Sequence, residues 1–331
     1  MLWSSWVDDL LSCGNKDNVL KGRETLKQHF DLDKVRELKE YVGCKVEYDK
    51  VNGQMKLTQP VLVQSFADEF DLPTRTFTTL MSPEQVLVGK GAPIRVSEAM
   101  HRQYQKGVGK LIHLGKYSKP VISNAVRELS GFGSNPNEAQ YLAMLQCLKY
   151  CVDTKDEGFV IHPLRQWNGK DRGFQFQISG ESDSTFASCL ETQRSESGWR
   201  ASLEGVPYTR KSKMQRFVTL SVTEAECVTA TSCVQNMIYG KNFLELLGLQ
   251  VELLMILEMD NNGGVDIFNN WSIAGNTRAV SIRFAYIREL KEARILEIRW
   301  IDGKENTSDL FTKNLDGMVF KMHASVFNGV A

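Results

Sequence analysis

The stretch TEAECVTATSCVQNMIYGKNFLELLG, residues 223–248, decides the fold of the C-terminal part of this chain. It begins with a Thr-Glu-Ala-Glu pattern, which is typical of a helix N-terminus, and it ends at Gly248, a residue type that commonly terminates helices. The stretch therefore predicts one long helix. Strand-like segments lie on both sides of it, so we expect the helix to pack against a sheet.

Short strand patterns surround the long helix. Residues 174–179 alternate apolar and polar side chains, which predicts a half-buried strand. Residues 198–209 and 214–221 predict two further strands before the helix, and residues 253–260 and 294–301 predict two more after it. Strands followed by alternating helices and strands are typical of an α/β layer, here of about 150 residues.

Four acidic residues lie where these predicted strands end or where predicted helices begin: Asp183, Glu226, Asp260 and Asp309. Such positions at one edge of a sheet can meet in space although they are far apart in sequence. Clustered carboxylates repel one another unless a cation neutralises them, and Mg²⁺ prefers oxygen ligands. Two such ions about 3.5–4 Å apart assist phosphodiester hydrolysis. The four acids together therefore predict a metal-dependent nuclease site.

Each acid also has a purely structural interpretation. Glu226 can complete a helix cap, and Asp309 can gain from the dipole of a short closing helix at residues 308–315. Asp260 precedes Asn-Asn-Gly-Gly, which is typical of a turn, and Asp183 lies in the loop-like sequence SGESDS. Taken singly, the structural interpretation is favoured for each residue, whereas the set of four favours the metal site.

The N-terminal residues predict a small α+β unit. An opening hairpin carries Asp8 and Asp9 at its turn, within the stretch WVDD, and an amphipathic helix follows at residues 17–30. A second hairpin turns at Asn52-Gly53. This part of the chain is therefore compact and mixed in structure.

A helical segment joins the two ends of the chain. A helix is predicted at residues 60–70, where Pro60 stands early. Residues 71–97 lack periodicity and indicate a linker. Residues 98–150 predict three helices, which indicates a connecting module.

Composition excludes several classes of protein. Basic and acidic residues number 40 each, so a surface that binds a polyanion must be local. The seven cysteines contain no C-x-x-C pair and the five histidines show no ligand spacing with them, which argues against zinc and favours reduced thiols. Without a signal-peptide pattern or an apolar stretch of about 18 residues, we expect a cytoplasmic or nuclear protein that is neither secreted nor membrane-spanning.

Five C-terminal segments carry a family resemblance: SDSTFASCLETQRSESGW, VTLSVTEAECVTA, EMDNNGGVDIFNN, TRAVSIRFAYIREL and GKENTSDLFTK. In order and spacing they resemble the ribonuclease H domain of copia-type LTR retrotransposon Pol polyproteins, with motifs S-D, S-S-T-E-A-E-Y, D-N-x-x-A and A-D-x-x-T-K. The resemblance implies that Asp183, Glu226, Asp260 and Asp309 match the metal-binding and catalytic carboxylates.

The same resemblance implies a fold, cofactors and a substrate. The fold is a ribonuclease H-like mixed five-stranded sheet with flanking helices. The cofactors are two Mg²⁺ ions, with Mn²⁺ as an alternative. The substrate is an RNA/DNA hybrid whose RNA strand is hydrolysed.

The resemblance extends upstream. Residues 104–161 resemble the segment that joins polymerase to nuclease in these polyproteins, and WVDD resembles the Y-V-D-D turn of a reverse transcriptase palm. The implied parts are a truncated palm and thumb remnant at 1–75, a linker and helical connection at 76–170, and the ribonuclease H-like domain at 171–331. Asp8 and Asp9 are then a relic polymerase site. We expect a fragment of a longer polyprotein without reverse transcriptase activity.

A run of cations without an acid predicts a nucleic-acid contact, at Arg210, Lys211, Lys213 and Arg216. These side chains suit the phosphates of a hybrid duplex, and a solvated hairpin is the alternative.

A catalytically dead retroelement remnant that at most binds nucleic acid is the alternative function. Thr185 and Phe186 stand where the family commonly carries an acid and a tryptophan, and a loosened metal site loses rate steeply. The sequence leaves the oligomeric state open.

Overall fold

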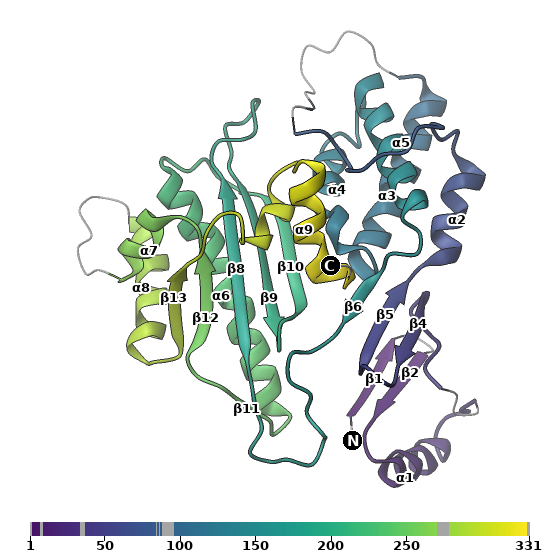
Figure 1. The fold of residues 1–331 in the computed structure, drawn as a ribbon, viewed down its shortest axis with the longest axis vertical. Coiled ribbons are helices and arrows are strands. Elements are labelled where there is room, and N and C mark those ends of the chain that lie inside the picture. Colours follow the sequence, from purple (N-terminus) through teal and green to yellow (C-terminus); the bar gives the residue numbers. More distant parts are fainter. Residues whose placement is uncertain are drawn as a thin grey trace.

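A five-stranded sheet forms the centre of the C-terminal half (Figure 1). The computed structural model describes residues 2–6, 9–33, 37–83, 85, 87, 96–269 and 278–329. The sheet has the order β10-β9-β8-β12-β13. Its strands are β8 (Ile178–Thr185), β9 (Glu196–Leu203), β10 (Val206–Met214), β12 (Met255–Met259) and β13 (Leu296–Trp300). β8, β9 and β10 are antiparallel neighbours, whereas β12 pairs in parallel with β8 and β13. The predicted mixed five-stranded α/β sheet is confirmed.

Helix α6 (Val222–Leu246) covers one face of this sheet, with α7 (Asn262–Asn269) and α8 (Arg278–Glu292) packed beside it. The helix approaches β8 so closely that a Cβ at Gly180 would lie 2.6 Å from Cys233 Sγ and 2.7 Å from Met237 Sδ. Both side chains are fully buried in the apolar cluster between α6 and the sheet, which also contains Leu257 and Ile298. We call this cluster the sheet core.

The strands before α6 differ from the prediction. β9 and β10 form a hairpin, and the predicted strand at 214–221 is irregular beyond the end of β10. Glu204 and Gly205 both have positive φ, 50° and 78°, which makes the two-residue turn that suits twisted hairpins. The Glu204 carboxylate accepts a hydrogen bond from Gln177 N at 2.7 Å and pairs with Arg165 at 2.8 Å. Glutamate rarely adopts a positive φ, and here contacts with Gln177 and Arg165 hold it there. The turn therefore could not be predicted from the sequence.

The predicted strand at 174–179 is divided in two. β7 (Gln175–Phe176) pairs in parallel with β11 (Gln250–Val251), and β8 begins at Ile178. β8 then continues to Thr185, so Asp183 lies within a strand and not in a loop after it.

The N-terminal half contains two small sheets. β1 (Leu2–Trp6) and β2 (Asp9–Cys13) form the predicted opening hairpin, and α1 (Lys16–Lys27) follows. The second sheet has the order β3-β4-β5-β6: β3 (Glu40–Tyr41), β4 (Cys44–Asp49), β5 (Gln54–Thr58) and β6 (Phe159–Ile161). The chain turns at Asn52-Gly53 between β4 and β5, as predicted. β6 was not predicted, and it ties the end of the helical segment to this sheet.

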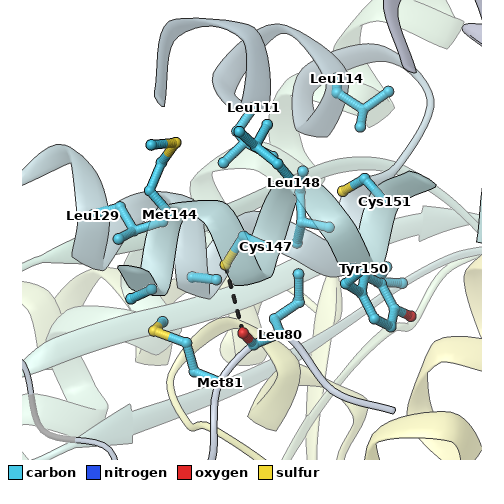
Figure 2. Packing of buried hydrophobic residues seen from close by; sticks show 14 of the residues in the cluster. Leu80, Met81, Leu111, Leu114, Leu129, Met144, Cys147, Leu148, Tyr150 and Cys151 are labelled. Carbon is cyan, nitrogen blue, oxygen red and sulfur yellow. Dashed lines mark hydrogen bonds between the residues drawn. The ribbon is translucent and has the colours of Figure 1, made fainter. Parts of the chain in front are cut away.

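The helical segment has a core of its own (Figure 2). Its helices are α2 (Pro60–Glu69), α3 (Glu98–Tyr117), η1 (Pro120–Ile122), α4 (Ser123–Ser130) and α5 (Glu138–Asp153). Two C-terminal elements, η2 (Thr307–Phe311) and α9 (Gly317–Asn328), bury Leu310, Phe311 and Phe327 in the same cluster, which we call the helical core. The sequence predicts a short helix at 308–315, where the structure has the shorter 3-10 helix η2, and it does not predict α9.

No helix in the described ranges combines the length and the apolar character that crossing a lipid bilayer requires.

Candidate metal centre

Three of the four predicted acids meet at one edge of the sheet. Asp183 lies in β8, Asp260 directly follows β12, and Glu226 lies near the start of α6. One carboxylate oxygen from each lies within 4.8 Å of the other two. Parallel pairing sets Met259 opposite Ser182, which brings the two aspartates to the same level of the sheet. The strand register and the start of α6 therefore assemble the cluster.

The cap of α6 uses Glu224 and not Glu226. Glu224 N donates to Ser221 Oγ at 3.1 Å, and Glu224 Oε2 accepts a hydrogen bond from Leu220 N at 2.7 Å. The structural role that the sequence left open for Glu226 is thus filled by its neighbour. The Glu226 carboxylate is left to face the other two acids.

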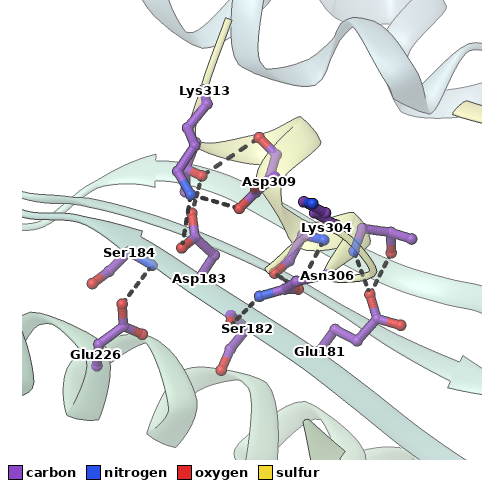
Figure 3. Close-up of polar contacts among 12 residues, drawn as sticks. Glu181, Ser182, Asp183, Ser184, Glu226, Lys304, Asn306, Asp309 and Lys313 are labelled. Atoms are coloured by element: carbon purple, nitrogen blue, oxygen red, sulfur yellow. Dashed lines mark hydrogen bonds and ion pairs between the residues drawn. The ribbon is translucent and has the colours of Figure 1, made fainter. Parts of the chain in front are cut away.

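Glu226 is buried with one oxygen unpartnered. Its side chain is only 3% exposed, and Oε1 accepts a hydrogen bond from Ser184 N at 3.2 Å (Figure 3). Oε2 has no hydrogen-bond partner in the described part of the chain. Burial, together with the charges of Asp183 and Asp260, raises the pKa of Glu226 to about 8. Burial and Asp183 also raise the pKa of Asp260.

This donor set fits a divalent cation. Buried polar atoms are normally paired, so the unpartnered Oε2 of Glu226 indicates a missing partner. The cluster offers only carboxylate oxygens, which are the ligands that Mg²⁺ and Mn²⁺ take most readily. A cation would also relieve the repulsion that raises the pKa of Glu226.

The fourth acid, Asp309, is paired with a lysine. Lys313 Nζ lies 2.7 Å from Asp309 Oδ1 and 3.4 Å from Asp183 Oδ1 (Figure 3). Thr312 Oγ1 donates a hydrogen bond to Asp183 Oδ2. Burial and the charge of Asp183 raise the pKa of Asp309 to about 7, although Lys313 acts in the opposite direction. The three-acid cluster found among the described residues does not include Asp309.

Polar contacts fasten η2 to the sheet next to the acids. Thr307 N donates to Glu181 Oε2 at 2.9 Å, and Arg200 pairs with Glu181 Oε1. Asn306 Nδ2 donates to the carbonyl oxygen of Ser182 at 3.2 Å (Figure 3). These contacts place the turn that carries Asp309 against β8.

The helical segment, which we also call the helical module, contacts η2 on the side away from the sheet. Phe311 is fully buried in the helical core. Asn124 Nδ2 of α4 donates to Asn314 Oδ1 at 3.0 Å. On the same helix, Arg127 pairs with Glu196 of β9 at 2.7 Å. The segment from η2 to Asn314 is therefore clamped between the sheet and α4.

The sequence analysis assigns no role to the residues that contact the acids and the η2 segment. Thr312 and Lys313 follow Asp309 by three and four residues, which is the spacing of neighbours on a helical turn, so a signal existed. Glu181 carried no such signal. Only the pairing of β8 with β9, which sets Glu181 opposite Arg200, reveals its role.

The predicted basic patch separates into two parts. The Arg210 guanidinium donates to the carbonyl oxygens of Gly115 and Lys116 at the end of α3, and burial lowers its pKa to about 10. Arg210 therefore joins β10 to the helical module and is not open to a phosphate, which corrects the prediction for this residue. Lys211, Lys213 and Arg216 are exposed. Their phosphate-binding role stays a prediction.

The predicted relic polymerase site, Asp8 and Asp9, falls where β2 begins. Asp8 lies outside the described residues, and Asp9 is the first residue of β2. Its assignment stays a prediction.

Comparisons with known proteins identify relatives along the chain, although no protein-family model matches it. It is 26% identical over 313 residues to the retrovirus-related Pol polyprotein from transposon TNT 1-94 of Nicotiana tabacum, covering 93% of this chain and 23% of that protein. It is 24% identical over 322 residues to the retrovirus-related Pol polyprotein from transposon RE1 of Arabidopsis thaliana, covering 97% and 21%. The chain thus spans less than a quarter of the length of these relatives.

Among solved structures, LC11-RNase H1 in complex with an RNA/DNA hybrid is similar at a TM-score of 0.31 and 15% identity, covering 39% of this chain and 88% of that chain. The sequence relatives extend over nearly all residues. The chain is a homologue of the retrovirus-related Pol polyproteins of transposons.

Proposed function

We propose that this retrotransposon-derived Pol fragment carries a ribonuclease H-type endonuclease at residues 171–331, which hydrolyses the RNA strand of RNA/DNA hybrids with Mg²⁺. The observation that carries the proposal is the meeting of Asp183, Glu226 and Asp260, with one oxygen of each within 4.8 Å of the others. The homology to Pol polyproteins supports the same class of reaction. Residues 1–75 and 76–170 would be a reverse transcriptase palm and thumb remnant and a helical connection.

The roles of the acids follow from their positions. Asp183, Glu226 and Asp260 would hold the ions, and Asp309 would help to bind the second ion or to release product. Bound Mg²⁺ supplies the positive charge that favours attack by water on the phosphodiester and stabilises the leaving oxygen. Thr312 and Lys313 orient the Asp183 carboxylate through a hydrogen bond and an ion pair.

We also propose which residues contact the nucleic acid and in which compartment the protein is located. Exposed Lys211, Lys213 and Arg216 would contact nucleic-acid phosphates. All seven cysteines are free thiols, which supports a cytoplasmic or nuclear location.

Cleavage of a hybrid whose RNA strand is fluorescently labelled tests the proposal. We expect Mg²⁺-dependent cleavage by the parent and none by Asp260→Asn, because the amide removes a charged ligand from the cluster. Equal melting temperatures would show that both chains are folded, and single-stranded RNA would serve as the substrate control. A variant as active as the parent would refute the assignment.

The second candidate is a nucleic-acid-binding remnant without catalysis. The observation in its favour is Lys313, which already balances Asp183 and Asp309 without a metal. A folded parent that binds hybrid but cleaves it with neither Mg²⁺ nor Mn²⁺ would establish this candidate.

A further inference from the structure

A cavity of about 450 Å³ lies on the α6 side of the sheet, and none of the three clustered acids lines it. It is bounded by β9, by the edge strand β10 (Figure 1), by the segment that follows β10, and by α6 and α8. The volume suits one unpaired nucleotide. The proposed nuclease function uses only the exposed cations at its rim, as phosphate contacts, and assigns no role to the interior.

The charges around the cavity have a single sign. Among the described residues that line it, every charged one is a cation: Arg210, Lys211, Lys213, Arg216 and Arg283. The chain as a whole has equal numbers of acids and bases, 40 each, so this is a local concentration of charge. A concave site with charges of one sign focuses the potential and attracts ions of the opposite sign. The cavity therefore favours a polyanion.

Three of these cations are available to a ligand. In the part of the chain that the structure describes, no hydrogen bond or ion pair joins the side chains of Lys211, Lys213 or Arg216 to another residue. Lys211 and Lys213 are two residues apart on β10, so both project to the same face. Their spacing along an edge strand suits successive phosphates of one strand of nucleic acid.

The inner wall offers contacts of another kind. Phe217 is 38% exposed, with the Arg283 guanidinium 5.2 Å from its ring centroid. Gln215 is only 5% exposed, and its Nε2 donates to Ser197 Oγ and to the Ala225 carbonyl oxygen, each at 3.0 Å. These bonds fix the amide, and Gln215 Oε1 has no partner among the described residues. The wall thus combines a partly exposed aromatic ring with a buried, hydrogen-bonded amide.

We infer that this cavity binds an unpaired nucleotide of a single-stranded nucleic-acid segment, with phosphates on Lys211, Lys213 and Arg216 and the base stacked against Phe217. A paired base is enclosed by its own duplex, so a duplex reaches only the cationic rim. An unpaired base can stack on an aromatic ring. The inference extends the proposed function, since such a segment would flank the hybrid that is cleaved.

Fluorescence anisotropy with a labelled twelve-nucleotide oligothymidylate tests the inference, in EDTA so that nuclease activity plays no part. We expect Lys211→Ala/Lys213→Ala to weaken binding about 10-fold or more and to reduce the salt dependence by about 1.4 log units per log unit, from two lost phosphate contacts. The control is Lys155→Ala/Lys170→Ala, which removes two exposed lysines that do not line the cavity.

The base contact has its own test. An abasic oligomer of the same length should bind about 5-fold or more weakly than oligothymidylate, and Phe217→Ala should remove that difference, because stacking on an aromatic ring is lost. Unchanged binding by the double lysine variant, equal binding of the abasic oligomer, or equally strong competition by a blunt duplex would each overturn the inference. These results do not depend on hybrid cleavage, so failure here leaves the nuclease proposal standing, and the reverse also holds.

Discussion

The sheet core and the helical core hold different parts of one acidic site. The three clustered acids lie on β8, on α6 and just after β12, all of which pack in the sheet core. Asp309 lies on η2, whose Leu310 and Phe311 pack in the helical core. The chain after β13 thus leaves the sheet, passes the acids and enters the other core.

The comparison shows which structural features fix the position of each carboxylate. Strand register and the start of α6 fix the cluster within a single packing unit. Asp309 depends on a contact between two units, through the Glu181–Thr307 bond on one side and the Asn124–Asn314 bond on the other. We therefore expect damage to the helical core to displace Asp309 and to leave the cluster in place.

Removal of the helical module should have the largest effect. In a chain limited to residues 171–331, Phe311 and Phe327 lose the apolar surface that covers them. We expect hybrid cleavage to fall at least about 100-fold, because a misplacement of about 1 Å at a metal site costs that much. Hydrogen exchange should show η2 and α9 unprotected while β8 and β12 stay protected. Full activity and full protection in the short chain would contradict the division of the site.

A single substitution can weaken the packing of η2 in the helical core without removing the helical module. Phe311→Ala removes a fully buried ring and should lower the free energy of unfolding by about 3–5 kcal/mol. Phe284→Ala is the matched control, since Phe284 is buried in the sheet core. At temperatures where both variants are folded, we expect cleavage by Phe311→Ala to fall further than cleavage by Phe284→Ala. Equal losses would mean that the helical core does not position Asp309.

Lys313 connects the acids of the two units. Lys313→Met leaves Asp183 and Asp309 without their cation and should lower the free energy of unfolding by about 1–3 kcal/mol, between the values for exposed and buried pairs. Added Mg²⁺ should then raise the melting temperature more in the variant than in the parent, because the metal replaces the lost charge. Lys313→Arg, which keeps the charge, is the control. A gain no larger than in the parent would show that Lys313 does not balance this site.

The smallest expected effect is the pH dependence of the free energy of unfolding, which depends on the buried acids of the site. Burial raises the pKa of Glu226 from 4.5 to about 8 and that of Asp309 from 3.8 to about 7, so the folded chain binds more protons than the unfolded chain between these values. Its free energy of unfolding should therefore fall as the pH rises from about 4 to 8 without divalent ions.

Calorimetry across this range checks the sign. Glu226→Gln cannot ionise at this position and should flatten the part of the profile that approaches pH 8. Stability that rises with pH over this window, or a Gln variant with the parent's profile, would contradict the raised pKa.

The strand patterns together with the family resemblance predicted a mixed five-stranded sheet and singled out the three acids that the structure brings together, but the strand predicted at 214–221 was wrong. It could not show that Glu204 adopts a positive φ, because contacts from Gln177 and Arg165 hold that conformation. It also gave no sign that Arg210 faces α3, since the period of a strand is visible but the neighbour on each face is not. The helical core shows the same limit. Phe320 and Phe327 are apolar in any fold, and only the tertiary structure places them beside α5 and η2.

The binding of Mn²⁺ followed by electron paramagnetic resonance tests the central claim most directly, that carboxylates from separate elements share divalent cations. At pH 8 we expect the parent to bind two ions and Asp260→Asn to lose at least one of them, at equal melting temperatures without metal. The same stoichiometry and affinity in both chains would contradict the account, because Asp260 would then not belong to a metal site.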